Sequence, residues 1–253
     1  MMLMKKIRKK LLAYYSELMC SLKRNNNVIW LSLGENCLPD DILKRHHKKS
    51  YSSLYASGRS NIEYATQMEN NNYNHLLDKD NLYFAKVGND TVVRSSLYNI
   101  SSQHYSELHL NGFEFTHHNP IDNVDHRLSF ERRIKRMIEG KGKQNFVFLY
   151  HHRICNNTNL ENARKHLKEF QKKYQAGEKK CFIIFFYQTL TKNNEQRQLK
   201  LVNSEDNILE FHLITQHIWA GHDKDIFWAR VDDDLIGRMI TESDNHINKL
   251  INL

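Results

Sequence analysis

The sequence predicts an α/β fold in which a mostly parallel central sheet is flanked by helices on both faces, a three-layer arrangement. Strongly apolar runs such as 28–33 and 181–187 are typical of strands that are buried on both faces. Segments with the apolar spacing of helices lie between such runs. The length of 253 residues suits one domain of this kind.

An amphipathic helix is predicted at the start of the chain, within residues 1–24. Basic side chains flank its apolar face, so the helix can lie on an anionic membrane surface or pack on the domain. The remaining residues, 25–253, are predicted to form one α/β domain. Four apolar residues define the helical face, namely Ile7, Leu11, Leu18 and Leu22.

The rest of the chain alternates between predicted strands and predicted helices. A stretch with several short strand-like pieces, 81–116, is predicted to be an irregular middle insertion. The predicted strands are 28–33, 145–150, 181–187 and 208–213, and the predicted helices after the first are 38–47, 60–70, 126–139, 159–174 and 232–250.

Charge and cysteine content narrow the classes of function. The net charge is +8, from 37 basic and 29 acidic residues, but the lysines are scattered. No nucleic-acid partner is therefore expected, whereas a small anionic ligand suits the same charge. The four cysteines have no disulfide-framework spacing, which favours a reducing cytoplasm. No apolar run is long enough to span a membrane.

Cys37 is the main candidate for chemistry. It follows an apolar strand and Gly34, and it precedes Pro39 and two aspartates, which mark the first turn of a helix. Backbone N–H groups at a helix start favour a thiolate, so this position suits a nucleophile. Gly34 and Asn36 are candidate donors to an oxyanion. The alternative is a buried cysteine on a core strand.

Other strand ends add histidines to the same edge. His151, His152 and Arg153 follow the strand at 145–150, and His222 and Asp223 follow the strand at 208–213. Because the carboxyl ends of parallel strands share one edge, these groups are expected to lie near Cys37. After the strand at 208–213, Asp223 is placed to orient the ring of His222.

A further histidine setting and an arginine-rich helix complete the candidates. His117 and His118 follow a short predicted strand and are alternative bases for Cys37. Arg132, Arg133 and Arg136 lie on one predicted helix, where they are candidates to bind the phosphates of a cofactor. The alternative is a solvated helix face with charged neighbours.

No metal is expected. The spacing of His152 and Cys155 is tolerable for zinc, but Cys-x-x-Cys and His-Glu-x-x-His motifs are absent from the sequence. The chain also contains no Walker loop and no Gly-x-Gly-x-x-Gly motif, so nothing indicates nucleotide hydrolysis or a dinucleotide cofactor.

The segment 31–37, LSLGENC, resembles the opening motif of a bacterial family of papain-like cysteine peptidases that is classed as a domain of unknown function. The family continues with an aromatic Pro-Phe-Asp-Trp-like segment, from which SSLYAS at 52–57 departs. A histidine block, a helix with paired arginines and a hydrophobic strand then follow. The matching stretches here are 115–119, 130–134 and 146–150, within a resemblance that covers about residues 28–190.

The resemblance implies a Cys–His site, with Cys37 as nucleophile and His117 or His118 as partner. Similar proteins are encoded beside capsule genes, and a related group is described as binding coenzyme A and acylating sugars. The expected function is thus acyl transfer, specifically O-acetylation of a capsular or other surface polysaccharide, or its precursor, from acetyl-CoA. His151, Arg153 and the three helix arginines are the expected cofactor-binding residues.

Two alternatives stay open at this point. One is a papain-like peptidase or amidohydrolase that uses the same thiol. The other is a non-catalytic component of a polysaccharide-assembly complex, with membrane or complex contact through residues 1–24. The expected location is cytoplasmic, with peripheral attachment at the inner membrane through that helix.

Overall fold

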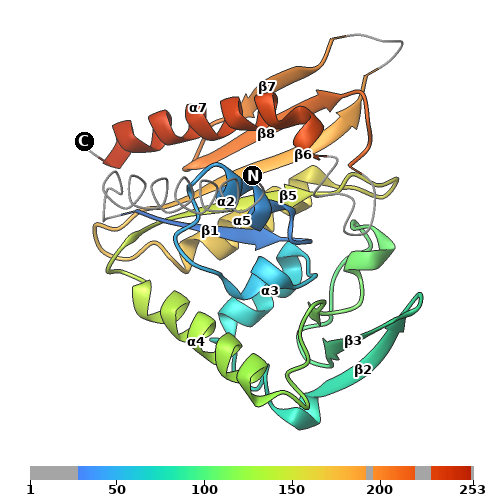
Figure 1. Ribbon diagram of the computed structural model, residues 1–253. Helices are drawn as coiled ribbons and strands as arrows, with labels where there is room; N and C mark the ends of the chain where they lie inside the picture. The colour runs from blue at the N-terminus through green and yellow to red at the C-terminus, as the bar shows by residue number, and fades with distance from the viewer. Residues whose placement is uncertain (1–27, 192–195, 220–228, 252–253) are drawn as a thin grey trace, which may run out of the picture.

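The computed structural model describes residues 28–191, 196–219 and 229–251, and it confirms the predicted α/β fold (Figure 1). A five-stranded sheet has the order β1-β5-β6-β8-β7, in which β1, β5, β6 and β8 run parallel and β7 is antiparallel to β8. The strands are β1 (Val28–Gly34), β5 (Asn145–His152), β6 (Cys181–Leu190), β7 (Gln198–Asn203) and β8 (Ile208–Thr215).

Helices cover both faces of this sheet. Figure 1 shows α7 on one side of the sheet and α3 and α4 on the other. The apolar contacts assign α2 to the α7 face and α5 to the α3 and α4 face. The helices are α2 (Leu38–Arg45), α3 (Ile62–Asn70), α4 (Val124–Gly140), α5 (Leu160–Lys172) and α7 (Asp233–Ile251).

The side chains of β5 show how the two cores arise. All eight residues of this strand are buried, as expected for a strand between two helical layers. Phe148 and Tyr150 face α3, α4 and α5, whereas Val147 and Leu149 point to the opposite side, toward α2 and α7. The alternation has the two-residue period of a strand, so consecutive residues at its end also point to opposite faces.

Asparagine side chains begin three of the helices. The Oδ1 atoms of Asn61, Asn123 and Asn159 accept hydrogen bonds from backbone N–H groups in the first turns of α3, α4 and α5. Each bond satisfies a donor that the helix itself leaves open. The predicted boundaries of these helices differ from the observed ones by no more than two residues.

The middle segment forms a small antiparallel sheet with the order β2-β3-β4. Its strands are β2 (Leu82–Val87), β3 (Asp90–Ser95) and β4 (Glu114–Phe115). The irregular insertion predicted for 81–116 therefore contains a defined sheet, to which Arg59 adds an isolated bridge opposite Glu114. In Figure 1 this sheet lies beyond α3 and α4, away from the main sheet.

The edge strand β7 was missed by the sequence reading. Most of its side chains are at least partly exposed, so it lacks the continuous apolar run that identified the other strands. Asp206 and Asn207, which both have left-handed backbone conformations, make the turn into β8. In the described part of the chain, no helix combines the length and the apolar character needed to cross a bilayer.

Candidate functional site

The carboxyl ends of β1 and β5 lie side by side, because Gly34 pairs in register with His151. Gly34 has a φ of +136°, a conformation that favours glycine. A Cβ at this position would lie 3.1 Å from Cδ2 of Tyr150, so the ring of Tyr150 packs directly on the glycine backbone. The glycine thus brings the next residue, Glu35, over the end of β5.

Glu35 is fully buried and is surrounded by hydrogen-bond donors. Its Oε1 accepts a bond from the hydroxyl of Tyr150 at 2.9 Å and faces Nδ1 of His152 at 2.7 Å. Its Oε2 accepts the backbone N–H of Arg153 at 3.0 Å and faces Nδ1 of His109 at 3.0 Å. Four groups from two distant segments therefore converge on one carboxylate.

These contacts set the protonation of the cluster. Burial opposes ionisation of Glu35, but the charge and hydrogen bonds of His152 and His109 hold its pKa well below the ordinary value. Burial lowers the pKa of His109, although Glu35 counteracts it. Burial, and then the charge of Glu35, raises the pKa of Tyr150 well above its usual range. At neutral pH, Glu35 is thus a carboxylate that accepts from a protonated phenol.

His152 is oriented by this carboxylate. A carboxylate only accepts hydrogen bonds, so Nδ1 of His152 carries the proton that faces Glu35. In the neutral ring, Nε2 then presents a lone pair. This atom is buried and has no hydrogen-bond partner in the structure. A carboxylate-oriented imidazole with an open second nitrogen is the arrangement of a general base.

His151 lies on the opposite face of the sheet, in accord with the strand period. Its ring packs against Phe186 and Trp219, at centroid distances of 4.9 and 5.6 Å. Burial, and next the charge of Arg153, lowers the pKa of His151 to about 3, so the ring is neutral at physiological pH. Its Nδ1 is also buried without a hydrogen-bond partner.

A pocket of about 390 Å³, here called the carboxyl-edge pocket, lies where the carboxyl ends of β5, β6 and β8 meet. Its volume is within the size range of small-molecule sites. His152 is one of its lining residues although the side chain is fully buried, so contact with Nε2 requires small shifts of the neighbouring side chains. The lining comprises residues that end β5, β6 and β8, namely His151, His152, Arg153, Ile154, Gln188, Thr189, Leu190, Ile218 and Trp219.

Hydrogen bonds fix one wall of this pocket. Nε2 of Gln188 donates to Oγ1 of Thr215 and to the carbonyl of His217, at 2.5 and 2.6 Å. Its Oε1 accepts the backbone N–H of Trp219 at 2.9 Å, and the indole of Trp219 donates to Asp232 at 2.8 Å. The segment after β8 is therefore held against the end of β6, which keeps the pocket preformed.

Cys37 occupies the predicted place. It is the N-cap residue of α2, is half-buried, and makes no side-chain capping bond. Oδ1 of Asn36 instead accepts the N–H of Leu38 at 3.0 Å, an Asx turn that leaves the Nδ2 group of Asn36 as a donor. Since α2 packs on the same sheet face as His151, topology brings the start of α2 and that imidazole to one corner.

The histidine pair after β4 lies against α4. His117 is exposed, and the ring of His118 packs on Phe130 and His126. Burial, and then the neighbouring Arg133, lowers the pKa of His118 to about 4. The structure therefore brings His118 and Arg133 together, but the described lining of the carboxyl-edge pocket contains neither of them.

The arginines of α4 also have local partners. The guanidinium of Arg133 packs on Phe130 and donates to Ser57 at 3.4 Å, and that of Arg136 packs on Tyr51. Arg132 is exposed, and its carbonyl accepts a bond from Arg136. Among the described residues, the predicted cofactor-binding set thus divides, since His151 and Arg153 line the carboxyl-edge pocket and the three arginines do not.

Some predictions fall outside the described residues. These are His222 and Asp223, and the amphipathic helix within residues 1–24. In the described part, no group of three side chains suited to metal binding occurs. His152 and Cys155, considered above for zinc, have other contacts, because Nδ1 of His152 faces Glu35 and Sγ of Cys155 accepts from Thr158.

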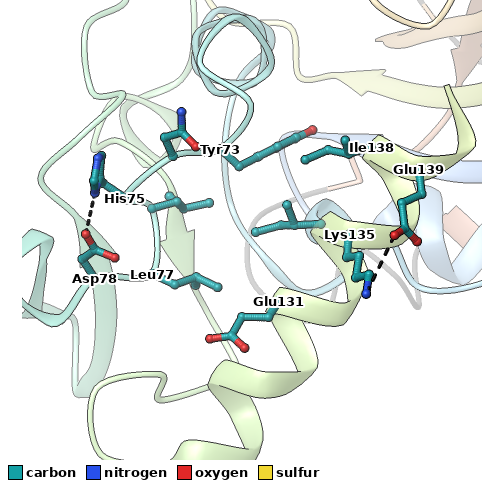
Figure 2. Close-up of a pocket in the computed structure, with 11 residues that line it drawn as sticks. Tyr73, His75, Leu77, Asp78, Glu131, Lys135, Ile138 and Glu139 are labelled. Carbon is teal, nitrogen blue, oxygen red and sulfur yellow. Dashed lines mark hydrogen bonds and ion pairs between the residues drawn. The ribbon is translucent and has the colours of Figure 1, made fainter.

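A larger pocket of about 500 Å³ lies between α4 and the segment 73–78 (Figure 2). Figure 2 shows two ion pairs among its lining residues, His75 with Asp78 and Lys135 with Glu139. No side chain that lines it has an unpartnered buried polar atom. We therefore place the candidate site at the smaller pocket, where two imidazole nitrogens are open.

No protein-family model matches the chain, and neither the curated proteins nor the solved structures contain a match. The geometry of the site and the motif around Cys37 are therefore the features that bear on function.

Sequence reasoning missed Glu35 and His109 as site residues. Glu35 could have been found, because an acidic residue directly after a strand-ending glycine lies at the edge where ligands bind. Tyr150 and His152 could have been paired with it, since they share one face of β5. His109 lies in a short 3-10 helix outside any regular strand or helix pattern, so nothing in the sequence indicated its position.

The neutral state of His151 predicts how stability depends on pH. Because its folded pKa lies below its unfolded value, acidification below about pH 6.5 protonates the unfolded chain first and stability is lost. We expect His151→Gln to reduce this loss by about 1.4 kcal/mol per pH unit between about pH 6 and 4. Urea unfolding across that range measures it, with the exposed His217→Gln as control. Equal slopes in wild type and His151→Gln would contradict the assignment.

The cysteines predict a labelling order. Burial, and then Glu69, raises the pKa of the Cys181 thiol well above its usual range, and the residue has no exposed surface. Half-buried Cys37 at a helix start is expected to react with iodoacetamide at least about tenfold faster in the folded protein. Peptide mass spectrometry over a time course measures both, and half-buried Cys155 is the comparator. If Cys37 reacts as slowly as Cys181, it is not a reactive thiol.

Proposed function

We propose that this protein is an acyltransferase that uses His152 as the general base for transfer to a hydroxyl acceptor. The observation that carries the proposal is the oriented imidazole. His152 faces Glu35 through Nδ1 at 2.7 Å, its Nε2 is buried with no hydrogen-bond partner, and the residue lines a pocket of about 390 Å³. An imidazole held in this way has a defined tautomer and a defined direction for proton transfer.

The proposed step is balanced around one proton. The acceptor O–H gives its proton to Nε2 of His152 while its oxygen attacks the carbonyl carbon of an acyl thioester. When the tetrahedral intermediate collapses, the C–S bond breaks and the thiolate receives the proton from the imidazolium. The carboxylate of Glu35 stabilises the imidazolium that exists between these two events.

Charge and similarity support the choice of substrates. Arg153 is the single arginine, lysine, aspartate or glutamate among the described lining residues, so an anionic donor such as acetyl-CoA suits the pocket. The resemblance of the Cys37 motif to proteins encoded with capsule genes favours the hydroxyl of a sugar or surface polysaccharide as acceptor. A protein with this role works at the cytoplasmic side of the inner membrane, where such precursors are assembled.

A covalent version of the same chemistry has its own support. Cys37 caps α2 at the corner where Gly34 turns the chain, and His151 lies on the same sheet face with an open Nδ1. In this version the thiolate of Cys37 takes the acyl group before the acceptor does. With water as acceptor, the same intermediate gives the peptidase or amidohydrolase alternative.

Substitutions of His152 and Glu35 test the proposal. Release of free thiol from acetyl-CoA, with and without sugar acceptors, measures the rate. We expect His152→Gln to lower it by about 10²- to 10⁴-fold, the usual contribution of a general base. Glu35→Gln keeps the shape but removes the charge, and should also change the pH dependence of the rate. Cys37→Ala separates the versions, because it abolishes only the covalent one.

Controls make the result decisive. The exposed His217→Gln variant should retain the wild-type rate, and thermal unfolding shows whether each variant is folded. A folded His152→Gln protein with an undiminished rate would refute the role of this base. If no variant changes any activity and no thioester is consumed, the non-catalytic alternative is favoured instead.

A further inference from the structure

Three adjacent strands each end with an exposed aliphatic side chain at the carboxyl-edge pocket. Ile154 follows β5, Leu190 ends β6 and Ile218 follows β8, and they are 37%, 45% and 53% exposed. All three line the pocket, as do His151 and His152. Because β5, β6 and β8 are neighbours in the sheet, the three side chains form a row along its edge.

Exposed aliphatic side chains are common when scattered, but a cluster around a pocket indicates an apolar ligand. The same pocket is also lined by His151 and His152, so one end of a ligand can contact imidazoles while the other contacts the aliphatic side chains. Ile218 is also held in place, since Gln188 binds the backbone on both sides of it. A preformed apolar surface of this kind binds without a large cost of ordering.

The dimensions indicate the size of the apolar group. Neighbouring strands lie about 4.8 Å apart, so a row across three strands spans roughly 10 Å. This is comparable to an extended chain of about eight carbons, whose C–C bonds are about 1.5 Å long. An acetyl group, with one methyl, covers only a small part of such a surface.

We propose that the pocket binds an aliphatic acyl group longer than acetyl, carried as a thioester on an anionic carrier. The chain lies on Ile154, Leu190 and Ile218, and the thioester carbonyl is directed toward His152. Arg153, between His152 and Ile154 in the chain, faces the anionic carrier. The transfer of the acyl group rests on the proposed acyltransferase function, but binding of the acyl chain to the pocket does not depend on it.

A chain-length series tests the inference by binding alone. Acetyl-, butanoyl-, hexanoyl- and octanoyl-CoA are titrated by calorimetry into the full chain carrying His152→Gln and Cys37→Ala, which removes both the proposed base and the proposed nucleophile. Affinity should rise with length, by up to about fourfold per methylene where the chain is fully buried. The matching N-acetylcysteamine thioesters lack phosphates, so comparing them with the coenzyme A esters measures the contribution of the anionic carrier. Octanoate lacks the thioester, so it shows whether the free acid binds as well as the thioester does.

Substitutions in the aliphatic row test where the acyl chain binds. Ile218→Ser and Leu190→Ser should flatten the dependence of affinity on acyl-chain length. Ile100→Ser and Leu128→Ser are matched controls, since these aliphatic residues are 78% and 42% exposed and lie outside the pocket lining. Arg153→Gln should weaken the coenzyme A esters more than the N-acetylcysteamine esters, with the length dependence retained.

The outcomes separate the two proposals. Affinity that does not change with chain length, or a length dependence that survives both substitutions in the aliphatic row, overturns the inference. Chain-length-dependent binding without turnover in the wild type supports the acyl site and counts against the transferase. Turnover of acetyl-CoA with no gain for longer chains supports the transferase and removes the longer acyl group.

Discussion

The carboxylate of Glu35 is the interaction on which this site depends. It joins the end of β1 to the end of β5 through Tyr150, His152 and the backbone of Arg153, and it joins both strands to the middle segment through His109. A buried charge is costly unless donors surround it. With four donors present, the carboxylate fixes the ring of His152 instead of destabilising the edge of the sheet.

Such a cluster is a poor way to gain stability. Buried ionic groups are often replaced by apolar residues of similar volume without loss of stability. The same edge also keeps two imidazole nitrogens buried without partners, and each costs about 1–3 kcal/mol. Some stability is thus given up beside a pocket, which is a pattern found at sites arranged for a ligand.

Much of the architecture could be predicted from local patterns. The apolar runs at β1, β5, β6 and β8 predicted the parallel strands, and the strand-end rule placed His151 and Arg153 at the edge of the sheet where the pocket lies. Local signals also placed Cys37 at the start of α2. The convergence of His109 on Glu35 was not predictable, because it depends on the path of an irregular segment in space. The hairpin at β7 was missed for a related reason, since an exposed edge strand has no apolar run.

The tautomer of His152 tests the central claim most directly. Long-range ¹H–¹⁵N correlation spectra of ¹⁵N-labelled protein distinguish a protonated ring nitrogen from a bare one, and His152→Gln identifies the signal. If Glu35 is a carboxylate that orients this ring, the neutral ring carries its proton on Nδ1 and leaves Nε2 unprotonated. A ring with its proton on Nε2, or one that exchanges between both tautomers, would contradict the account.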